Sequence, residues 1–149
     1  MITYQPVDRE RDIEFARRLH HLVYREVVIR QFGAWNEEMQ DRFFEEDWWA
    51  SPFQFILRDG ARVGLLSASA KEDYRFVHEI MVLPEYQGHG IGTHVLREQI
   101  AEASRLAQPL KLKVLRKNRA KDLYERLGFV PYDESDTFIF MTTAPVSDD

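Results

Sequence analysis

Cysteine is absent from the 149-residue chain. Its absence excludes a disulfide framework, a thiolate metal site and a cysteine nucleophile, and it fits a reducing compartment. No apolar run approaches the roughly 20 residues that a membrane-spanning helix needs. The first residues, Met1-Ile2-Thr3-Tyr4-Gln5-Pro6, lack the basic and apolar regions of a signal peptide. We therefore expect a cytoplasmic protein with no membrane partner.

An excess of basic residues is also missing. The chain has 20 Lys+Arg against 25 Asp+Glu, a formal net charge of -5. Because domains that grip nucleic-acid phosphates are usually basic, we expect no nucleic-acid partner. A chain of this length can bury one core without staples. We expect a single domain over 1–143 and a flexible tail over 144–149.

Hydrophobic spacing and turn residues predict alternating helices and strands. Apolar residues three to four apart predict a helix over 12–31, which Gly33 ends. Asn36 is expected to cap a second helix that runs to about Trp49. Asp59-Gly60 is typical of a tight hairpin turn. The other expected elements are strands over 1–7, 53–58, 61–71, 74–83, 110–115, 130–132 and 138–143, and helices over 90–107 and 118–127. This order predicts an α/β (α+β layered) domain, a mixed sheet with helices packed on its faces.

A glycine-rich segment gives the most specific chemical signal. The strand that ends near Leu83 leads through Gln87-Gly88-His89-Gly90-Ile91-Gly92-Thr93 directly into a helix. Glycine permits positive φ and the close approach of a ligand. Unpaired amides at a helix N-terminus, together with the helix dipole, bind anions. The segment can therefore hold a phosphate group without a lysine. The alternative is a loop whose glycines only serve the turn.

Two other phosphate-binding loops do not fit this segment. A P-loop ends in Gly-Lys-Ser/Thr, whereas Gly92 precedes Thr93 with no lysine. A dinucleotide-binding loop needs G-x-G-x-x-G spacing, whereas Gly88, Gly90 and Gly92 lie two apart. The spacing therefore disfavours a P-loop protein and a nicotinamide enzyme.

Two segments resemble the GNAT superfamily of N-acetyltransferases. Gln87-x-x-Gly90-x-Gly92 matches the family's Gln/Arg-x-x-Gly-x-Gly/Ala signature. The segment 118–129 is similar to the family's N-x-x-A-x-x-x-Y-x-x-x-G-F region, with Ala120 one position early. The resemblance implies a mixed, mostly antiparallel sheet of about six to seven strands with helices on both faces.

The resemblance also implies acetyl-CoA as the acyl donor. Amides of the glycine-rich segment would hold the pyrophosphate, and the strand before it would part from its neighbour to bind the pantetheine arm. His89 is either a phosphate donor or a solvated side chain, and Asn118 either contacts the coenzyme or caps its helix, or does both. The expected donor-binding residues are Met81, Val82, Leu83, Gln87, Gly88, His89, Gly90, Ile91, Gly92, Thr93, Asn118 and Tyr124.

Acyl transfer to an amine needs a base and an acid, because an alkyl amine has a pKa near 10 and arrives charged. Glu79 is our candidate base, since apolar neighbours would raise its pKa. His78 is the rival, and strand alternation places the two on opposite faces unless a bulge intervenes. Tyr124 resembles the family's tyrosine that reaches the coenzyme sulfur and is our candidate acid. The alternatives are an ion pair for Glu79 and core packing for Tyr124. A backbone amide near Val82 is expected to meet the oxyanion.

The first two helices are expected to form one wall of the acceptor site. Aromatic residues and carboxylates alternate there, which suits a cationic amine. Phe32, Trp35 and Glu79 are the expected substrate-binding residues, and a solvated acidic face is the alternative. His20-His21 has no third ligand at metal spacing, so we expect no metal.

These expectations combine into one reaction. An acetyl group would move from acetyl-CoA to the primary amine of a small molecule, an amino acid or a peptide N-terminus, by direct attack in a ternary complex. The alternative is a catalytically silent acyl-CoA-binding or regulatory module on the same scaffold. The sequence leaves open the acceptor, the acyl chain and the oligomeric state, with a homodimer among the alternatives.

Overall fold

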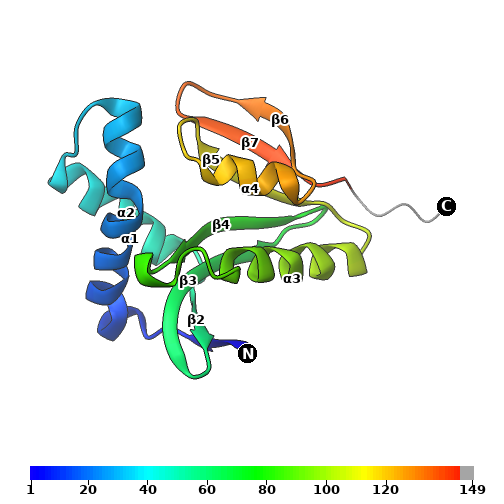
Figure 1. Cartoon of the computed structure of the whole chain (residues 1–149), viewed down its shortest axis with the longest axis horizontal. Helices are drawn as coiled ribbons and strands as arrows, with labels where there is room; N and C mark the ends of the chain where they lie inside the picture. Colours follow the sequence, from blue (N-terminus) through cyan, green and yellow to red (C-terminus); the bar gives the residue numbers. More distant parts are fainter. Residues whose placement is uncertain (145–149) are drawn as a thin grey trace.

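The computed structural model describes residues 1–144, so the predicted tail lies outside the described residues except for Ala144 (Figure 1). The strands are Ile2–Pro6 (β1), Gln54–Arg58 (β2), Ala61–Ala70 (β3), Arg75–Val82 (β4), Leu110–Leu115 (β5), Val130–Glu134 (β6) and Phe138–Thr142 (β7). They form one sheet in the order β1-β2-β3-β4-β5-β7-β6. Only β4 and β5 pair in parallel. The mixed, mostly antiparallel α/β sheet is confirmed.

The helices begin and end at residues whose side chains or conformations cap them. They are Arg9–Phe32 (α1), Glu37–Ala50 (α2), Ile91–Arg105 (α3) and Ala120–Arg126 (α4), with a 3-10 turn at Pro84–Tyr86 (η1). Asn36 accepts from the Met39 amide as expected, and Gly33 ends α1 in the left-handed region. Helix α1 starts three residues before the predicted 12–31 because the Asp8 side chain accepts from the Arg11 amide.

Two helix layers cover opposite faces of the sheet (Figure 1). Helices α1 and α2 pack on one face through Leu19, Phe44 and Trp48. Helices α3 and α4 pack on the other face, with Val95 and Leu96 from α3 in that core. Within residues 1–144, no helix is long and apolar enough to cross a membrane.

Strands β4 and β5 separate soon after they begin to pair. Their register joins Arg75–Val77 to 110–112 and then stops. In Figure 1, β2, β3 and β4 lie on one side of the separation and β5, β7 and β6 on the other. The later backbone groups of β4 that face this gap have no strand partner within residues 1–144, so the predicted parting of this strand from its neighbour is present.

A bulge interrupts β4 at His78, immediately after the last residue of β4 that pairs with β5. Glu79 pairs with Ser67 on β3, whereas Val77 pairs with Ala68, which leaves His78 as the extra residue. A bulge of this kind changes the face to which the following side chains point. It therefore sets the direction of Glu79.

Gly64 on β3 lies so close to β4 that a side chain does not fit. A Cβ there would lie 2.1 Å from the Met81 carbonyl oxygen. We expect Gly64→Ala to lower the free energy of unfolding by about 1–3 kcal/mol or more, the usual cost of overpacking, as measured by urea denaturation. Gly92→Ala is the matched control, because its Cβ would make an ordinary contact at 3.8 Å with Leu123. Equal stability of the two variants would contradict this explanation.

Candidate functional site

Two clefts meet beside the gap between β4 and β5. The aromatic cleft has a volume of about 810 Å³ and lies against α1, α2, β4, β5 and β7. The glycine-loop cleft has a volume of about 530 Å³ and follows the turn from η1 into α3, with α4 opposite. Tyr24, Asn118 and Tyr124 line both clefts. The two clefts therefore adjoin at these three side chains.

The glycine-loop cleft has the features of an anion site. Gly88 and Gly90 both have φ of 80°, which other residues rarely adopt. Gly90 is the N-cap of α3 and supplies no side-chain acceptor to the first amides of that helix. Those amides and the helix dipole suit a phosphate group. The predicted residues that line this cleft are Val82, Gln87, Gly88, Gly90, Ile91, Gly92, Thr93, Asn118 and Tyr124.

Three predicted donor-binding residues lie elsewhere among residues 1–144. The Met81 side chain is buried in the core beneath α1 and α2. The Leu83 amide donates to the Val63 carbonyl oxygen at 2.8 Å. The His89 ring is exposed, and its Nδ1 lies 3.1 Å from Arg58 Nη1. A role of Met81 in donor binding can therefore involve only its backbone groups.

Asn118 and Gln87 also hold the backbone at the edge of this cleft. Asn118 Oδ1 accepts from the Ala120 amide at 2.9 Å one residue before the N-cap of α4, which is Arg119, and the side chain lines both clefts. Gln87 Nε2 donates to the Val82 carbonyl oxygen at 3.0 Å. The first bond holds the backbone at the start of α4, and the second holds the backbone at the end of β4.

Glu79 and His78 both line the aromatic cleft, because the bulge brings them to the same face. The sequence predicts that only one of the two faces the cleft unless a bulge intervenes. The bulge is present, and both residues face the cleft. The Tyr24 hydroxyl donates to Glu79 Oε2. His78 Nε2 lies 2.7 Å from Ser69 Oγ. Glu79 therefore has a fixed orientation toward Tyr24.

Glu79 shares its surroundings with a second carboxyl group, that of Asp47 on α2. Burial of the carboxyl group and the nearby Asp47 charge raise the pKa of Glu79 to about 8, although the Tyr24 hydrogen bond opposes the rise. Burial also raises the pKa of Asp47. Two crowded carboxyl groups cannot both ionise easily, so the pair tends to hold one proton.

Tyr124 projects from α4 to the point where the clefts meet. Its side chain is only 8% exposed, and its ring contacts the edge of Phe129. Burial, followed by the Glu79 charge, raises the pKa of the hydroxyl above its ordinary value. The hydroxyl is therefore protonated at neutral pH and available as a donor.

The two aromatic residues predicted for the acceptor wall lie in different places. Phe32 lines the aromatic cleft, but Trp35 does not. The Trp35 ring packs on His21, and its Nε1 donates to Glu37 at 2.5 Å. Tyr24 was not predicted from the sequence, because it lies 55 residues from its partner Glu79. Asp47 had a weak signal, because it belongs to the run of aromatic and acidic residues on α2.

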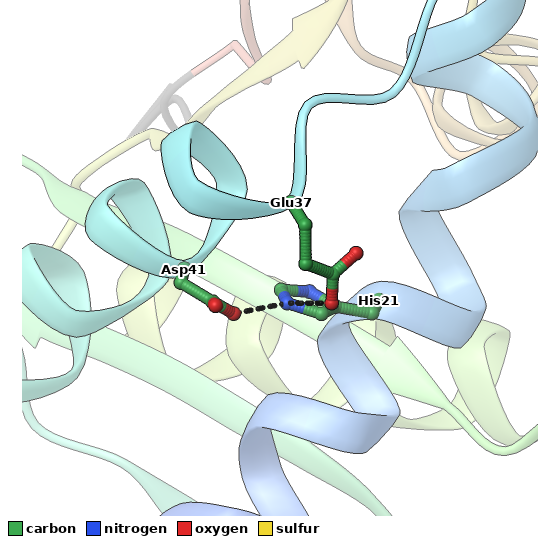
Figure 2. A group of neighbouring side chains, drawn as sticks. All are labelled: His21, Glu37 and Asp41. Atoms are coloured by element: carbon green, nitrogen blue, oxygen red, sulfur yellow. Dashed lines mark hydrogen bonds and ion pairs between the residues drawn. The ribbon is translucent and has the colours of Figure 1, made fainter.

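A group of potential metal ligands lies between α1 and the first turns of α2 (Figure 2). His21, Glu37 and Asp41 bring ligand atoms within 4.8 Å of one another, which the spacing of His20-His21 did not reveal. His21 Nε2 lies 2.7 Å from Asp41 Oδ1, and Arg17 Nη1 lies 3.7 Å from the same oxygen. A hydrogen bond and an ion pair thus already use these atoms. The absence of a metal stays a prediction.

Comparisons with known proteins identify relatives of this arrangement. The sequence model of the acetyltransferase (GNAT) family matches residues 16–129. No curated protein sequence matches the chain. The PaiA N-acetyltransferase of Thermoplasma acidophilum, solved in complex with coenzyme A, has a TM-score of 0.74 at 19% identity, and the match covers 97% of this chain and 99% of that one. The ribosomal-protein-S18-alanine N-acetyltransferase of Escherichia coli has 0.63 at 21% identity, covering 100% and 98%. YjaB of Escherichia coli, solved in its apo form, has 0.77 at 14% identity, covering 98% and 99%. At these identities the structural likeness shows the fold alone.

We expect Asp47→Asn to lower the pKa of Glu79 from about 8 toward its ordinary 4.5, because the variant removes the neighbouring negative charge. NMR titration of the Glu79 carboxyl carbon measures this directly. Glu46→Gln is the control, since Glu46 lines the same cleft but does not contribute to the shift. The explanation is wrong if the Glu79 titration is the same in both variants.

Proposed function

Since the chain belongs to the acetyltransferase (GNAT) family, we propose that it transfers an acetyl group from acetyl-CoA to a primary amine. The acceptor amine belongs to a small molecule, an amino acid or a peptide N-terminus. The observation that carries this proposal is the meeting of the two clefts at Tyr24, Asn118 and Tyr124. One cleft has the groups that suit a diphosphate, and the other has the carboxyl groups that suit a cation.

The glycine-loop cleft would bind the donor. The amides from Gln87 to Thr93 would hold the pyrophosphate of the coenzyme. The free backbone groups of β4 beyond its pairing with β5 would bind the peptide-like pantetheine arm, because buried backbone groups need partners. The complex of the Thermoplasma acidophilum relative with coenzyme A supports this use of the fold.

The aromatic cleft would bind the acceptor and remove its proton. Glu79 would accept a proton from the acceptor ammonium, directly or through water, and its raised pKa of about 8 suits that task. The neutral amine would attack the thioester carbonyl, and a backbone amide near Val82 would stabilise the oxyanion. Tyr124 would donate its proton to the departing sulfur and recover one from the amine nitrogen. The products would be an amide, the free thiol and one released proton.

A panel of amines with acetyl-CoA tests the proposal. We expect thiol release that depends on the amine, and heat in a calorimetric titration with acetyl-CoA alone. Heat without thiol release for any amine would favour the silent acyl-CoA-binding module. The absence of heat at millimolar coenzyme would refute the role of the glycine-loop cleft.

Tyr124→Phe should separate chemistry from binding. We expect kcat to fall by about 10²-fold, within the range for a positioned acid, because only the hydroxyl is lost. The Kd of acetyl-CoA should change by less than about twofold, since the ring and its contact with Phe129 remain. Tyr86→Phe is the control, because Tyr86 lines the same cleft outside the meeting point. Unchanged turnover in Tyr124→Phe would remove the hydroxyl from the mechanism.

A further inference from the structure

The aromatic cleft contains more apolar surface than binding an ammonium group requires. Five phenylalanines line it, namely Phe32 from α1, Phe43 from α2, Phe76 from β4, and Phe138 and Phe140 from β7. Phe32 and Phe43 are 54% and 52% exposed. Two large apolar side chains that line one cleft and remain exposed would bury area against a ligand with an apolar arm.

The same cleft carries unbalanced negative charge. Glu46, Asp47 and Glu79 line it, and none forms an ion pair with a basic side chain of residues 1–144. The Asp47–Glu79 pair tends to hold one proton and so keeps one negative charge, and Glu46 adds a second. Lys113 is the only lysine or arginine in the described chain that lines the cleft. Its ammonium lies 4.5 Å from the centre of the Phe138 ring. A cationic ligand is therefore favoured over an anionic one.

The two histidines of the cleft, His20 and His78, do not offset its negative charge at neutral pH. Burial, with a smaller effect of His21, lowers the pKa of His20 to about 3. Burial, with the charge of Lys71, lowers the pKa of His78 below its ordinary value. Both rings are therefore neutral, and they add polar and aromatic surface without positive charge.

On the premise that the acceptor is an amine, as proposed above, we infer that it is a primary amine on an aromatic arm with no carboxylate beside the amine. The ammonium lies against Glu79 and Asp47, and the arm extends along the rings of Phe32 and Phe43. A free amino acid carries its carboxylate on the same carbon as its amine and would bring it against Glu79 and Asp47. A decarboxylated aromatic amine avoids that repulsion and keeps the apolar contact.

Three ligands test the aromatic arm and the absence of a carboxylate separately: phenethylamine, phenylalanine and ethylamine. We expect phenethylamine to bind at least about tenfold more tightly than ethylamine, because of the buried ring. It should also bind at least about tenfold more tightly than phenylalanine, because of the like-charge contact. NMR titration of the protein in the presence of coenzyme A gives the affinities without turnover, and kcat/KM with acetyl-CoA should follow the same order.

A variant of the cleft wall locates the apolar contact. Phe43→Ser should weaken phenethylamine binding by about tenfold and leave ethylamine binding unchanged. Met39→Ser is the matched control, because Met39 is also an exposed apolar residue of α2 (45%) but does not line the cleft. It should affect neither ligand.

The outcomes separate this inference from the proposed activity. Equal affinity for phenethylamine and ethylamine, or equal affinity for phenethylamine and phenylalanine, would overturn the inference even if amines are acetylated. If phenethylamine binds in the expected order but no amine causes thiol release, the cleft recognises aromatic amines and the proposed transfer is wrong.

Discussion

Strands β4 and β5 stop pairing after Val77, and the position of every group in the two clefts depends on that separation. If the pairing continued, the backbone groups of β4 near Val82 would be used within the sheet. Instead the gap admits Tyr124 from α4 on one face and Tyr24 from α1 on the other. On its opposite edge β4 stays paired with β3 from Arg75 to Val82, and Gly64 permits the close approach of Met81. A strand supported on only one side can therefore present its other side to ligands.

The polar groups around the bulge are arranged at a cost to stability. A carboxyl group that is removed from water loses hydration, and here Glu79 also faces Asp47. Opposite it, Ser67 Oγ is buried without a hydrogen-bond partner among residues 1–144. Apolar packing would be more stable at such a position. Local rules of folding are commonly broken at functional sites, and the bulge concentrates these unfavourable groups where the clefts meet.

Signals that act over a few residues were readable from the sequence, and contacts between distant elements were not. Gly33, Asn36 and Asp59-Gly60 each fix a local conformation through their own backbone or side chain, so the elements that they bound were predicted nearly in place. The start of α1 differs from the prediction, although the Asp8 cap that sets it is itself a local signal. The bulge at His78 could not be predicted, because it exists only in relation to the register of β3. Tyr24 and Asp47 gain their importance from Glu79, which lies far from both in the chain.

The glycine-loop cleft could be predicted from the sequence better than the aromatic cleft, for the same reason. A diphosphate is recognised by main-chain amides, which need a glycine-rich turn and a helix start in one continuous segment. Such a segment leaves a pattern that a family model detects over residues 16–129. The proposed acceptor would be recognised by side chains that α1, α2, β4, β5 and β7 contribute separately. The exposed ones, Phe32 and Phe43, can change without disturbing the turn or the sheet. Proteins that share this fold at 14–21% identity can thus differ in these side chains, so that a proposed acceptor has to be inferred from the charges and rings of each cleft.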